Sequence, residues 1–139
     1  MKILLITVLF FSQCSKSNLD LMNDTPLIVV IKFISAESQL KFEIAKTYMD
    51  VDKVFSNSPD SLNVEEEWKE MNRTFYALGS SKKFTNEFSC FNYEIDETIN
   101  VDEAFVTFTS IDQKVMIKKI IYKLHKTDTW KIVAIEYLN

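Results

Sequence analysis

Few side chains in this sequence could carry out chemistry, and their spacing assembles no catalytic or metal-binding motif. The chain has one histidine, His125, and two cysteines, Cys14 and Cys90, whereas a zinc site needs paired cysteine and histidine ligands. Its single glycine excludes a glycine-rich phosphate-binding loop. No spacing indicates a Ser-His-Asp set. The sequence therefore predicts no metal, no cofactor and no enzymatic activity.

His125 closes a run of alternating apolar and polar residues, which indicates a β-strand. The apolar residues of this run share one face: Met116, Ile120, Tyr122 and Leu124. Because the apolar face must cover the core, His125 is expected on the solvated face, where nothing tunes an imidazole for catalysis. We therefore predict that His125 is not catalytic. A one-residue bulge near Lys118 would exchange the two faces.

Cys14 follows a short basic and apolar leader. Lys2 supplies the positive charge, Ile3–Phe11 form the apolar run, and Ser12–Gln13 separate that run from Cys14. This order is typical of a secretory signal, and the run is too short for a permanent membrane span. A buried N-terminal strand or helix is the alternative. A disulfide to Cys90 would tie the domain to a removable leader, so we favour lipid attachment at Cys14.

The position of Cys14 resembles the lipobox of bacterial lipoproteins, in which the cysteine is acylated and becomes the new N-terminus. Such boxes usually have a small residue before the cysteine and an aliphatic one three before, where this chain has Gln13 and Phe11. The resemblance implies export to the cell envelope and membrane attachment through two or three acyl chains, which hold firmly. The alternative location is a soluble secreted or periplasmic protein.

The remaining residues are predicted to form one domain. Residues 1–14 are the signal, residues 15–24 a polar tether, and residues 25–139 a domain within a chain that is 47% hydrophobic and 26% charged. The net charge of −4 argues against a nucleic-acid surface. The lysines near the C-terminus are divided between the two faces of the predicted strands, so they form no phosphate-binding patch.

The C-terminal part of the chain alternates with a period of two residues, which predicts a β-sheet. Three strands are indicated, at residues 104–109, 116–125 and 130–135. Residues 126–129 are expected to connect the last two strands as an antiparallel hairpin. In the last strand Trp130, Ile132 and Ala134 are expected on the apolar face.

A further strand is expected from Lys82 onward, with a blurred end between Tyr93 and Ile99. Phe88 and Cys90 would point toward the core, so Cys90 is predicted to be buried rather than reactive. The acidic stretch Asn100–Glu103 is expected to form the turn into the next strand. The sheet would then have about four strands.

Upstream of the sheet, helix signals predict three helical segments. Thr25 and Pro26 suit the cap and first position of the first helix, and the polar stretch Ser35–Gln39 is expected to interrupt it. A second helix is expected over Leu40–Met49, followed by a further turn within Asp50–Phe55.

The third helix is the most clearly marked one. Asn63 is its expected cap, three glutamates occupy its first turn, and Gly79 follows Leu78 at its end. The apolar residues recur with helical spacing and predict one buried stripe: Val64, Trp68, Met71, Phe75 and Leu78. Helices that precede an antiparallel meander indicate an α+β fold.

A family resemblance covers Thr25 to Leu138. It is carried by Phe33 in the first helix, Ala45 and Tyr48 in the second, the strand start Ala104–Val106, and Trp130–Ile132. The chain resembles the nuclear-transport-factor-2-like superfamily, and more narrowly a lumazine-binding-like group of small exported bacterial lipoproteins of unknown function. The resemblance implies a cone-shaped α+β roll, in which the N-terminal helices pack in the concave face of a curved, mostly antiparallel sheet.

Six aromatic residues are expected on the concave side: Tyr48, Trp68, Phe75, Phe88, Tyr122 and Trp130. They would fill the core or line a ligand pocket, and core filling is the favoured interpretation. The expected role is that of a non-catalytic exported lipoprotein that binds a small apolar ligand or a protein partner. A second copy of the chain, bound through the sheet face, is a further partner. The alternatives are an isomerase- or dehydratase-type enzyme and a structural or immunity-type partner protein.

Overall fold

The computed structural model describes residues 24–56, 63–79, 93–112 and 117–139, and for residues 75–79 it describes the backbone only. The chain has an α+β fold, as predicted, with helices first and an antiparallel sheet of order β1-β2-β3-β4 after them. The elements are α2 (Pro26–Ser38), α3 (Phe42–Ala45), α4 (Val51–Val54), α5 (Val64–Gly79), β1 (Tyr93–Asn100), β2 (Glu103–Ser110), β3 (Lys119–Lys126) and β4 (Trp130–Leu138).

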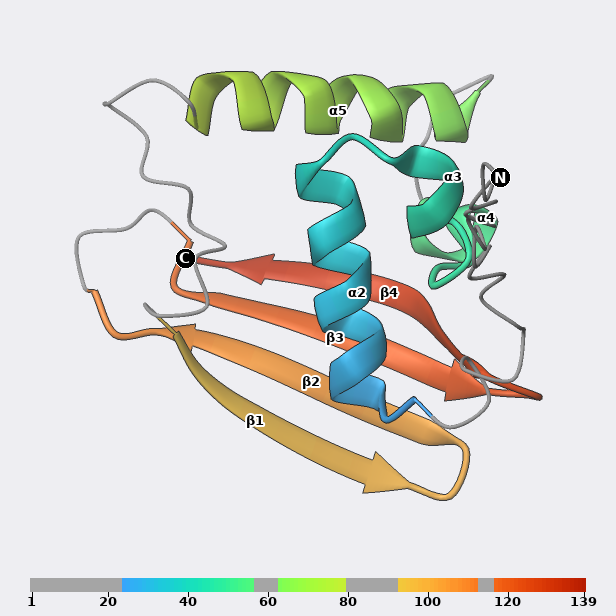
Figure 1. Ribbon diagram of the computed structural model, residues 1–139. Coiled ribbons are helices and arrows are strands. Elements are labelled where there is room, and N and C mark those ends of the chain that lie inside the picture. The colour runs from blue at the N-terminus through green and yellow to red at the C-terminus, as the bar shows by residue number, and fades with distance from the viewer. Residues whose placement is uncertain (1–23, 57–62, 80–92, 113–116) are drawn as a thin grey trace, which may run out of the picture.

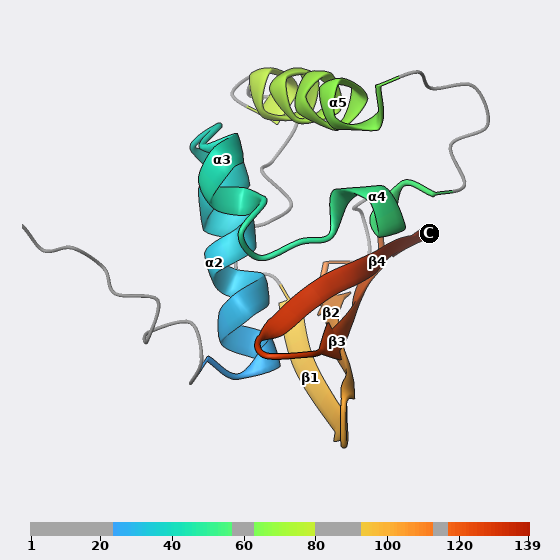
Figure 2. The ribbon, with the colours of Figure 1, turned by 90° about the vertical axis from the view of Figure 1, so that its right-hand side faces the viewer.

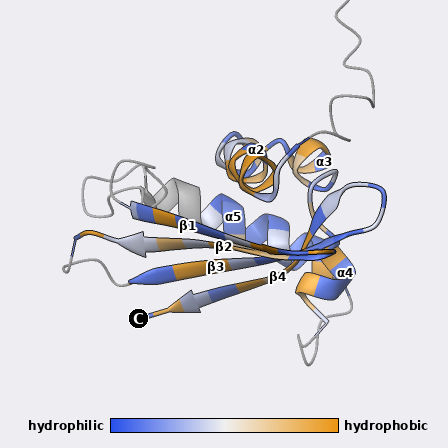
Figure 3. Ribbon diagram, turned by 90° about the horizontal axis from the view of Figure 1, so that it is seen from below, coloured by the Kyte–Doolittle hydropathy of each residue, from blue (hydrophilic) through white to orange (hydrophobic). Residues whose placement is uncertain are grey.

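Helices α2 and α3 lie over one face of the sheet, and α5 lies across the top, beyond the β4 edge (Figures 1 and 2). Helix α2 crosses the sheet and contacts β1, β2 and β4, whereas α5 contacts α2 and α4 and lies farther from the strands. Figure 3 shows that α5 is more hydrophilic than α2, in keeping with its place on the outside. The core therefore lies between α2 and the sheet, and α5 is added above it.

Helix α2 begins as the sequence predicts. The Thr25 hydroxyl accepts a hydrogen bond from the Ile28 amide at 3.3 Å, and Pro26 is the first helical residue. The carboxylate of Glu97 in β1 accepts a hydrogen bond from the Leu27 amide at 2.8 Å, which satisfies another free donor at this helix end. The expected interruption at Ser35 is wrong, because the helix continues to Ser38.

Helix α2 ends in a Schellman motif with leucine in the glycine position. The Leu40 amide donates to the Glu37 carbonyl at 2.8 Å, and the Lys41 amide donates to the Ala36 carbonyl at 2.9 Å. Leu40 has a φ of 55°, in the left-handed region where its Cβ is unfavourable. Its side chain is 44% exposed, so core packing does not compensate for this strain.

Replacing Leu40 with glycine is expected to raise the free energy of unfolding by roughly 0.5–1 kcal/mol. The left-handed penalty of about 1–2 kcal/mol disappears, while glycine adds about 0.5–1 kcal/mol of chain entropy to the unfolded state. Thermal unfolding followed by circular dichroism should show a rise in Tm of roughly 2 °C. Leu40→Ala is the matched control, since alanine keeps a Cβ in the left-handed conformation. An equal rise in both variants would contradict this explanation.

The predicted helix over Leu40–Met49 is much shorter than expected, because α3 covers Phe42–Ala45 only. The chain leaves the helix in order to bind the edge of β4. Ile132 donates its amide to the Tyr48 carbonyl and accepts the Asp50 amide, both at 2.9 Å, and Met49 forms a parallel bridge with Ile132. This pairing also places α4 beside β4, in the stretch where a further helical turn was predicted.

The inner faces of β2 and β3 agree with the predicted alternation. Their buried residues include Ala104, Val106, Phe108, Ile120, Tyr122 and Leu124. His125 has the register of the outer face, as predicted, between Glu103 of β2 and Lys131 of β4. The histidine is therefore placed away from the core.

Strand β4 departs from the predicted alternation. Trp130 and Ile132 are buried, as expected. The register then shifts, because Leu124 pairs with Ile132 while Lys123 pairs with Ala134, so Val133 is the extra residue of a bulge. The placement of Ala134 on the inner face is therefore wrong, and Tyr137 takes the inner position opposite the buried Ile120.

Strand β1 occupies the stretch that was expected to be the blurred end of an earlier strand. It pairs with β2 through its whole length, and only Tyr93 among its residues is buried. Val101 and Asp102 form the turn to β2, inside the predicted stretch Asn100–Glu103. The strand expected from Lys82 lies outside the described residues, as do Cys90, Met116, residues 1–23 and with them Cys14.

Candidate functional site

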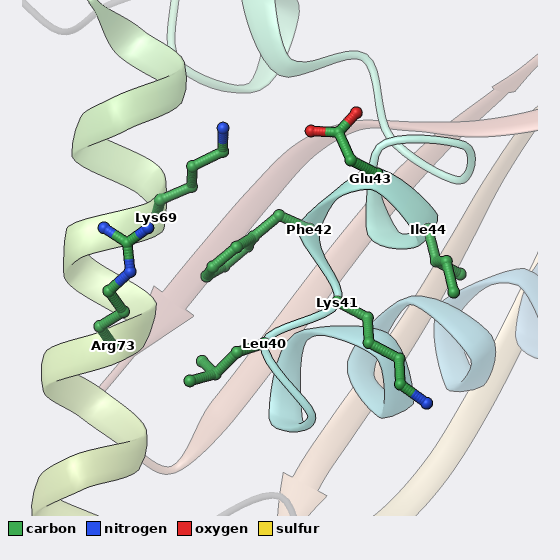
Figure 4. Close-up of a pocket in the computed structure, with 7 residues that line it drawn as sticks. All are labelled: Leu40, Lys41, Phe42, Glu43, Ile44, Lys69 and Arg73. Atoms are coloured by element: carbon green, nitrogen blue, oxygen red, sulfur yellow. The ribbon is translucent and has the colours of Figure 1, made fainter.

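A hollow of about 400 Å³ opens between α3 and α5 (Figure 4). The side chains of Leu40 and Phe42 point toward α5, and those of Lys69 and Arg73 extend from α5 beside them. Residues of both elements line the hollow: Leu40, Lys41, Phe42, Glu43, Ile44, Lys69 and Arg73. The hollow thus combines an apolar side on the α2–α3 connection with a cationic side on α5.

The two cations on α5 are held by glutamates of the same helix. The Lys69 ammonium lies 2.6 Å from a Glu65 carboxylate oxygen, and hydrogen bonds from Lys69 and then Lys46 lower the pKa of Glu65. Arg73 Nη1 pairs with Glu66 at 3.3 Å and also with Glu70.

The aromatic side chain of the hollow orders the Arg73 guanidinium further. The guanidinium carbon lies 5.5 Å from the centroid of the Phe42 ring, within the range of a cation–π contact. The ion pairs within α5 and the Phe42 ring together hold the Arg73 guanidinium at the edge of the hollow.

Phe42 connects the hollow to the protein interior. Its ring meets the Trp68 indole edge-on, with centroids 5.2 Å apart and planes at 75°. Trp68 is 1% exposed, and its Nε1 donates to a carboxyl oxygen of Glu37 at 2.7 Å. The bottom of the hollow is thus one aromatic layer away from a buried carboxyl group.

Glu37 is the most unusual titratable group of this region. It is 6% exposed, and burial raises its pKa from 4.5 to about 7, although hydrogen bonds with Trp68 and Asn72 act in the opposite direction. Asn72 is itself buried and donates from Nδ2 to the Trp68 carbonyl at 2.9 Å. This cluster of Glu37, Trp68 and Asn72 joins α2 to α5, and its charge changes near neutral pH.

Tyr137 reaches the same cluster from the sheet. Burial, and then the nearby Glu37 carboxylate, raise the pKa of the Tyr137 phenol. The residue as a whole is 46% exposed, so the enclosure concerns its phenol end rather than the whole side chain. Tyr137 owes this position to the bulge in β4, which turns it inward.

A second hollow of about 400 Å³ lies beside α4, with mixed charges around it. Its lining includes Asp50, Glu65 and Lys46. Lys46 pairs with Glu65 at 2.9 Å, and Lys53 pairs with Asp50 at 3.0 Å. Both hollows carry ion pairs, but no aromatic side chain among the described residues lines this one, so it lacks the aromatic surface of the hollow beside Phe42.

The aromatic residues predicted for the concave side are mostly core residues. Trp68, Tyr122 and Trp130 are buried, and Tyr48 is partly buried against the core. Tyr122 packs edge-on against Phe33 and Phe108, with ring centroids 6.3 and 5.8 Å apart. The hollow beside α5 is lined by other residues. The Phe75 side chain and Phe88 lie outside the described residues.

Three residues of this region were not singled out by the sequence: Glu37, Leu40 and Asn72. The predicted stripe on α5 placed Met71 inside, but Met71 is 48% exposed and Asn72 is buried. The spacing of Trp68 and Asn72, four residues apart, is the signal that could have placed both on one face.

Metal-ligand geometry and comparison with known proteins assign no function to this site. In the part of the chain that the structure describes, no three His, Cys, Asp or Glu side chains gather as metal ligands would. No helix among the described residues has the length and apolarity to cross a membrane. Comparison of the chain with protein-family models, curated proteins and solved structures finds no match.

Proposed function

We propose that this protein is a non-catalytic, exported lipoprotein whose domain binds a small, largely apolar ligand in the hollow between α3 and α5. The volume of about 400 Å³ lies within the range of small-molecule sites, about 300–1,000 Å³. We further propose that the domain is a roll of the nuclear-transport-factor-2-like type. Helices packed on one face of a four-stranded antiparallel meander support that assignment.

The conformation of Leu40 is the observation that carries the proposal. A leucine at the left-handed position of a Schellman motif costs stability that glycine would recover. Its side chain is 44% exposed and points into the hollow beside Phe42. Strained, exposed apolar residues are typical of binding sites, where the strain is offset when a ligand covers the side chain.

Among the residues that the structure describes, the candidate base for an isomerase- or dehydratase-type enzyme is Glu37, whose pKa near 7 suits that role. A base must come within hydrogen-bond reach of its substrate. The Glu37 carboxyl is instead enclosed by Trp68 and Asn72, on the inner side of the Phe42 ring. This enclosure supports binding over catalysis.

Binding can be tested with N-phenyl-1-naphthylamine, a neutral apolar dye that fluoresces when it leaves water. Saturable fluorescence is expected with the full chain carrying Cys14→Ser, which avoids detergent. Leu40→Gly should weaken binding roughly tenfold, since about half of a leucine side chain loses its contact. This variant is expected to be more stable, so unfolding cannot explain the loss. Ile28→Ala, at an exposed position of α2, is the control; an equal loss there, or none in Leu40→Gly, would refute the proposal.

We also propose that lipid on Cys14 attaches the protein to a membrane of the cell envelope. Cys14→Ser is expected to move the protein from the membrane fraction to the soluble fraction, since the acyl chains supply the anchor. Fractionation with immunodetection measures the shift, and labelled fatty acid should appear on the wild-type chain alone. Cys90→Ser is the matched control. A wild-type chain that never takes up the label, with a mature N-terminus elsewhere, would rule out this anchor and leave a soluble exported protein.

A further inference from the structure

We propose that the ligand of the hollow is a single-chain acyl carboxylate, with its chain on Leu40 and Phe42 and its carboxylate at the Arg73 guanidinium. This inference rests on the proposed function and adds the chemical class of the ligand. It follows from the way the two sides of the hollow differ in chemistry.

The apolar side of the hollow is the reason to expect an alkyl chain, which has no polar atoms. Leu40 and Phe42 present no hydrogen-bonding group along their side chains, and Phe42 is backed by the buried Trp68 ring. An alkyl chain laid along them would cover the exposed part of Leu40. A polar or sugar-like ligand would lose hydrogen bonds to water on this side and gain none.

The cationic side of the hollow is the reason to expect a carboxylate on the ligand. Arg73 offers a planar fork of donors that matches a carboxylate with two parallel hydrogen bonds. The pairs that the described residues form with Arg73 use Nη1, and the guanidinium carbon lies 5.5 Å from the centroid of the Phe42 ring, so the fork lies at the edge of the hollow. Lys69, one helical turn away, adds positive charge to this side, although its ammonium pairs with Glu65 at 2.6 Å and points away from Arg73 in Figure 4.

Two glutamates of α5 compete with a ligand for Arg73, but weakly. The side chains of Glu66 and Glu70 are 52% and 64% exposed, and exposed ion pairs contribute little to stability. A ligand carboxylate held by its alkyl chain has a high effective concentration at Arg73, so it can displace them. Glu43, on the opposite side of the hollow, pairs with Lys46 at 3.6 Å, and in Figure 4 its carboxylate lies level with the Lys69 ammonium rather than with Arg73.

Displacement of N-phenyl-1-naphthylamine by three probes of equal chain length tests the inference: dodecanoate, 1-dodecanol and dodecyltrimethylammonium, the two ions below their micelle concentrations and the alcohol below its solubility limit. Dodecanoate is expected to displace the dye at a concentration at least tenfold lower than the alcohol, and the cation is expected to be the weakest. Arg73→Gln should remove the advantage of dodecanoate and leave the alcohol unchanged. Lys53→Gln, an exposed lysine outside the hollow, is the matched control.

The outcomes separate this inference from the proposed function. Equal displacement by dodecanoate and dodecanol would overturn the anionic ligand and leave an apolar site in place. Dye that does not bind at all, or binds without regard to Leu40, would overturn the site itself. Binding that appears only with phosphatidylglycerol vesicles, and not with dodecanoate, would point to a membrane surface and also contradict an acyl carboxylate.

Discussion

The free energy of unfolding is expected to fall by about 2–3 kcal/mol between about pH 5 and pH 8, because the Glu37 carboxyl is neutral in the folded protein at the lower pH. Its pKa of about 7 in the fold stands above the value of 4.5 that it has when exposed. An acid with a raised pKa binds its proton more tightly in the folded state. Its stabilisation is therefore fully present below pH 4.5 and is lost as pH rises through 7.

Other carboxyl groups change the stability of the protein in a different pH range. Hydrogen bonds with lysines lower the pKa of Glu65, and the pKa of Asp50 is lowered too, mainly by Lys53 against the opposing effect of burial. Their stabilisation is present above their unfolded pKa and is lost only on acidification. These two groups make the protein less stable as pH falls. A decrease in stability as pH rises above about 5 has the opposite sign and therefore indicates Glu37.

Urea unfolding of the wild type and Glu37→Gln, followed by far-ultraviolet circular dichroism at several pH values, measures this effect. Glutamine stays neutral and its oxygen still accepts from the Trp68 indole, so stability should become nearly independent of pH in this range. At the alkaline end the variant should be more stable than the wild type. Glu94→Gln, on the exposed strand β1, should keep the wild-type slope. The same slope in Glu37→Gln would show that another group titrates.

Much of the sheet was predictable because its pattern is local. Strands β2 and β3 alternate strictly, so their buried residues and the outward position of His125 followed from the period alone. Helix α2 was equally predictable at its start, where Thr25 and Pro26 act within one turn. In each case the information lies within a few neighbouring residues.

The predictions that were wrong concern structure that depends on contacts between distant segments of the chain. The helix over Leu40–Met49 is cut short by bonds to Ile132, which no local pattern encodes. The bulge at Val133 reverses the faces of β4, although the residues around it alternate.

The candidate site was missed for the same reason. Glu37 looked like part of a polar break, and only the approach of Trp68, thirty-one residues away, makes it a buried group with a partner. The position of Leu40 in a Schellman motif requires knowing that α2 continues to Ser38.

Trp130→Ala is expected to cost about 3–5 kcal/mol, the usual range for truncating a buried tryptophan. Trp130 is 8% exposed and starts β4 beside Ile132, on the inner face before the bulge. Its ring also lies under the Lys126 ammonium, 5.6 Å from the centroid, and the Lys126 amide donates to the Asp102 carbonyl at 2.8 Å. Losing the indole therefore removes core packing and loosens the end of the β3–β4 hairpin, next to the β1–β2 turn.

The cost is a large share of a total stability that is typically about 5–15 kcal/mol, so Tm should fall by roughly 10 °C. Thermal and urea unfolding measure it, with Trp68 fluorescence as an independent probe of the folded state. Trp130→Phe should lose less, because a ring still fills most of the volume. Phe105→Ala, on the outer face of β2, is the control for truncating an aromatic residue of the sheet. A Trp130→Ala protein that melts within a degree or two of the wild type would show that the hairpin is held by its backbone pairing rather than by this side chain.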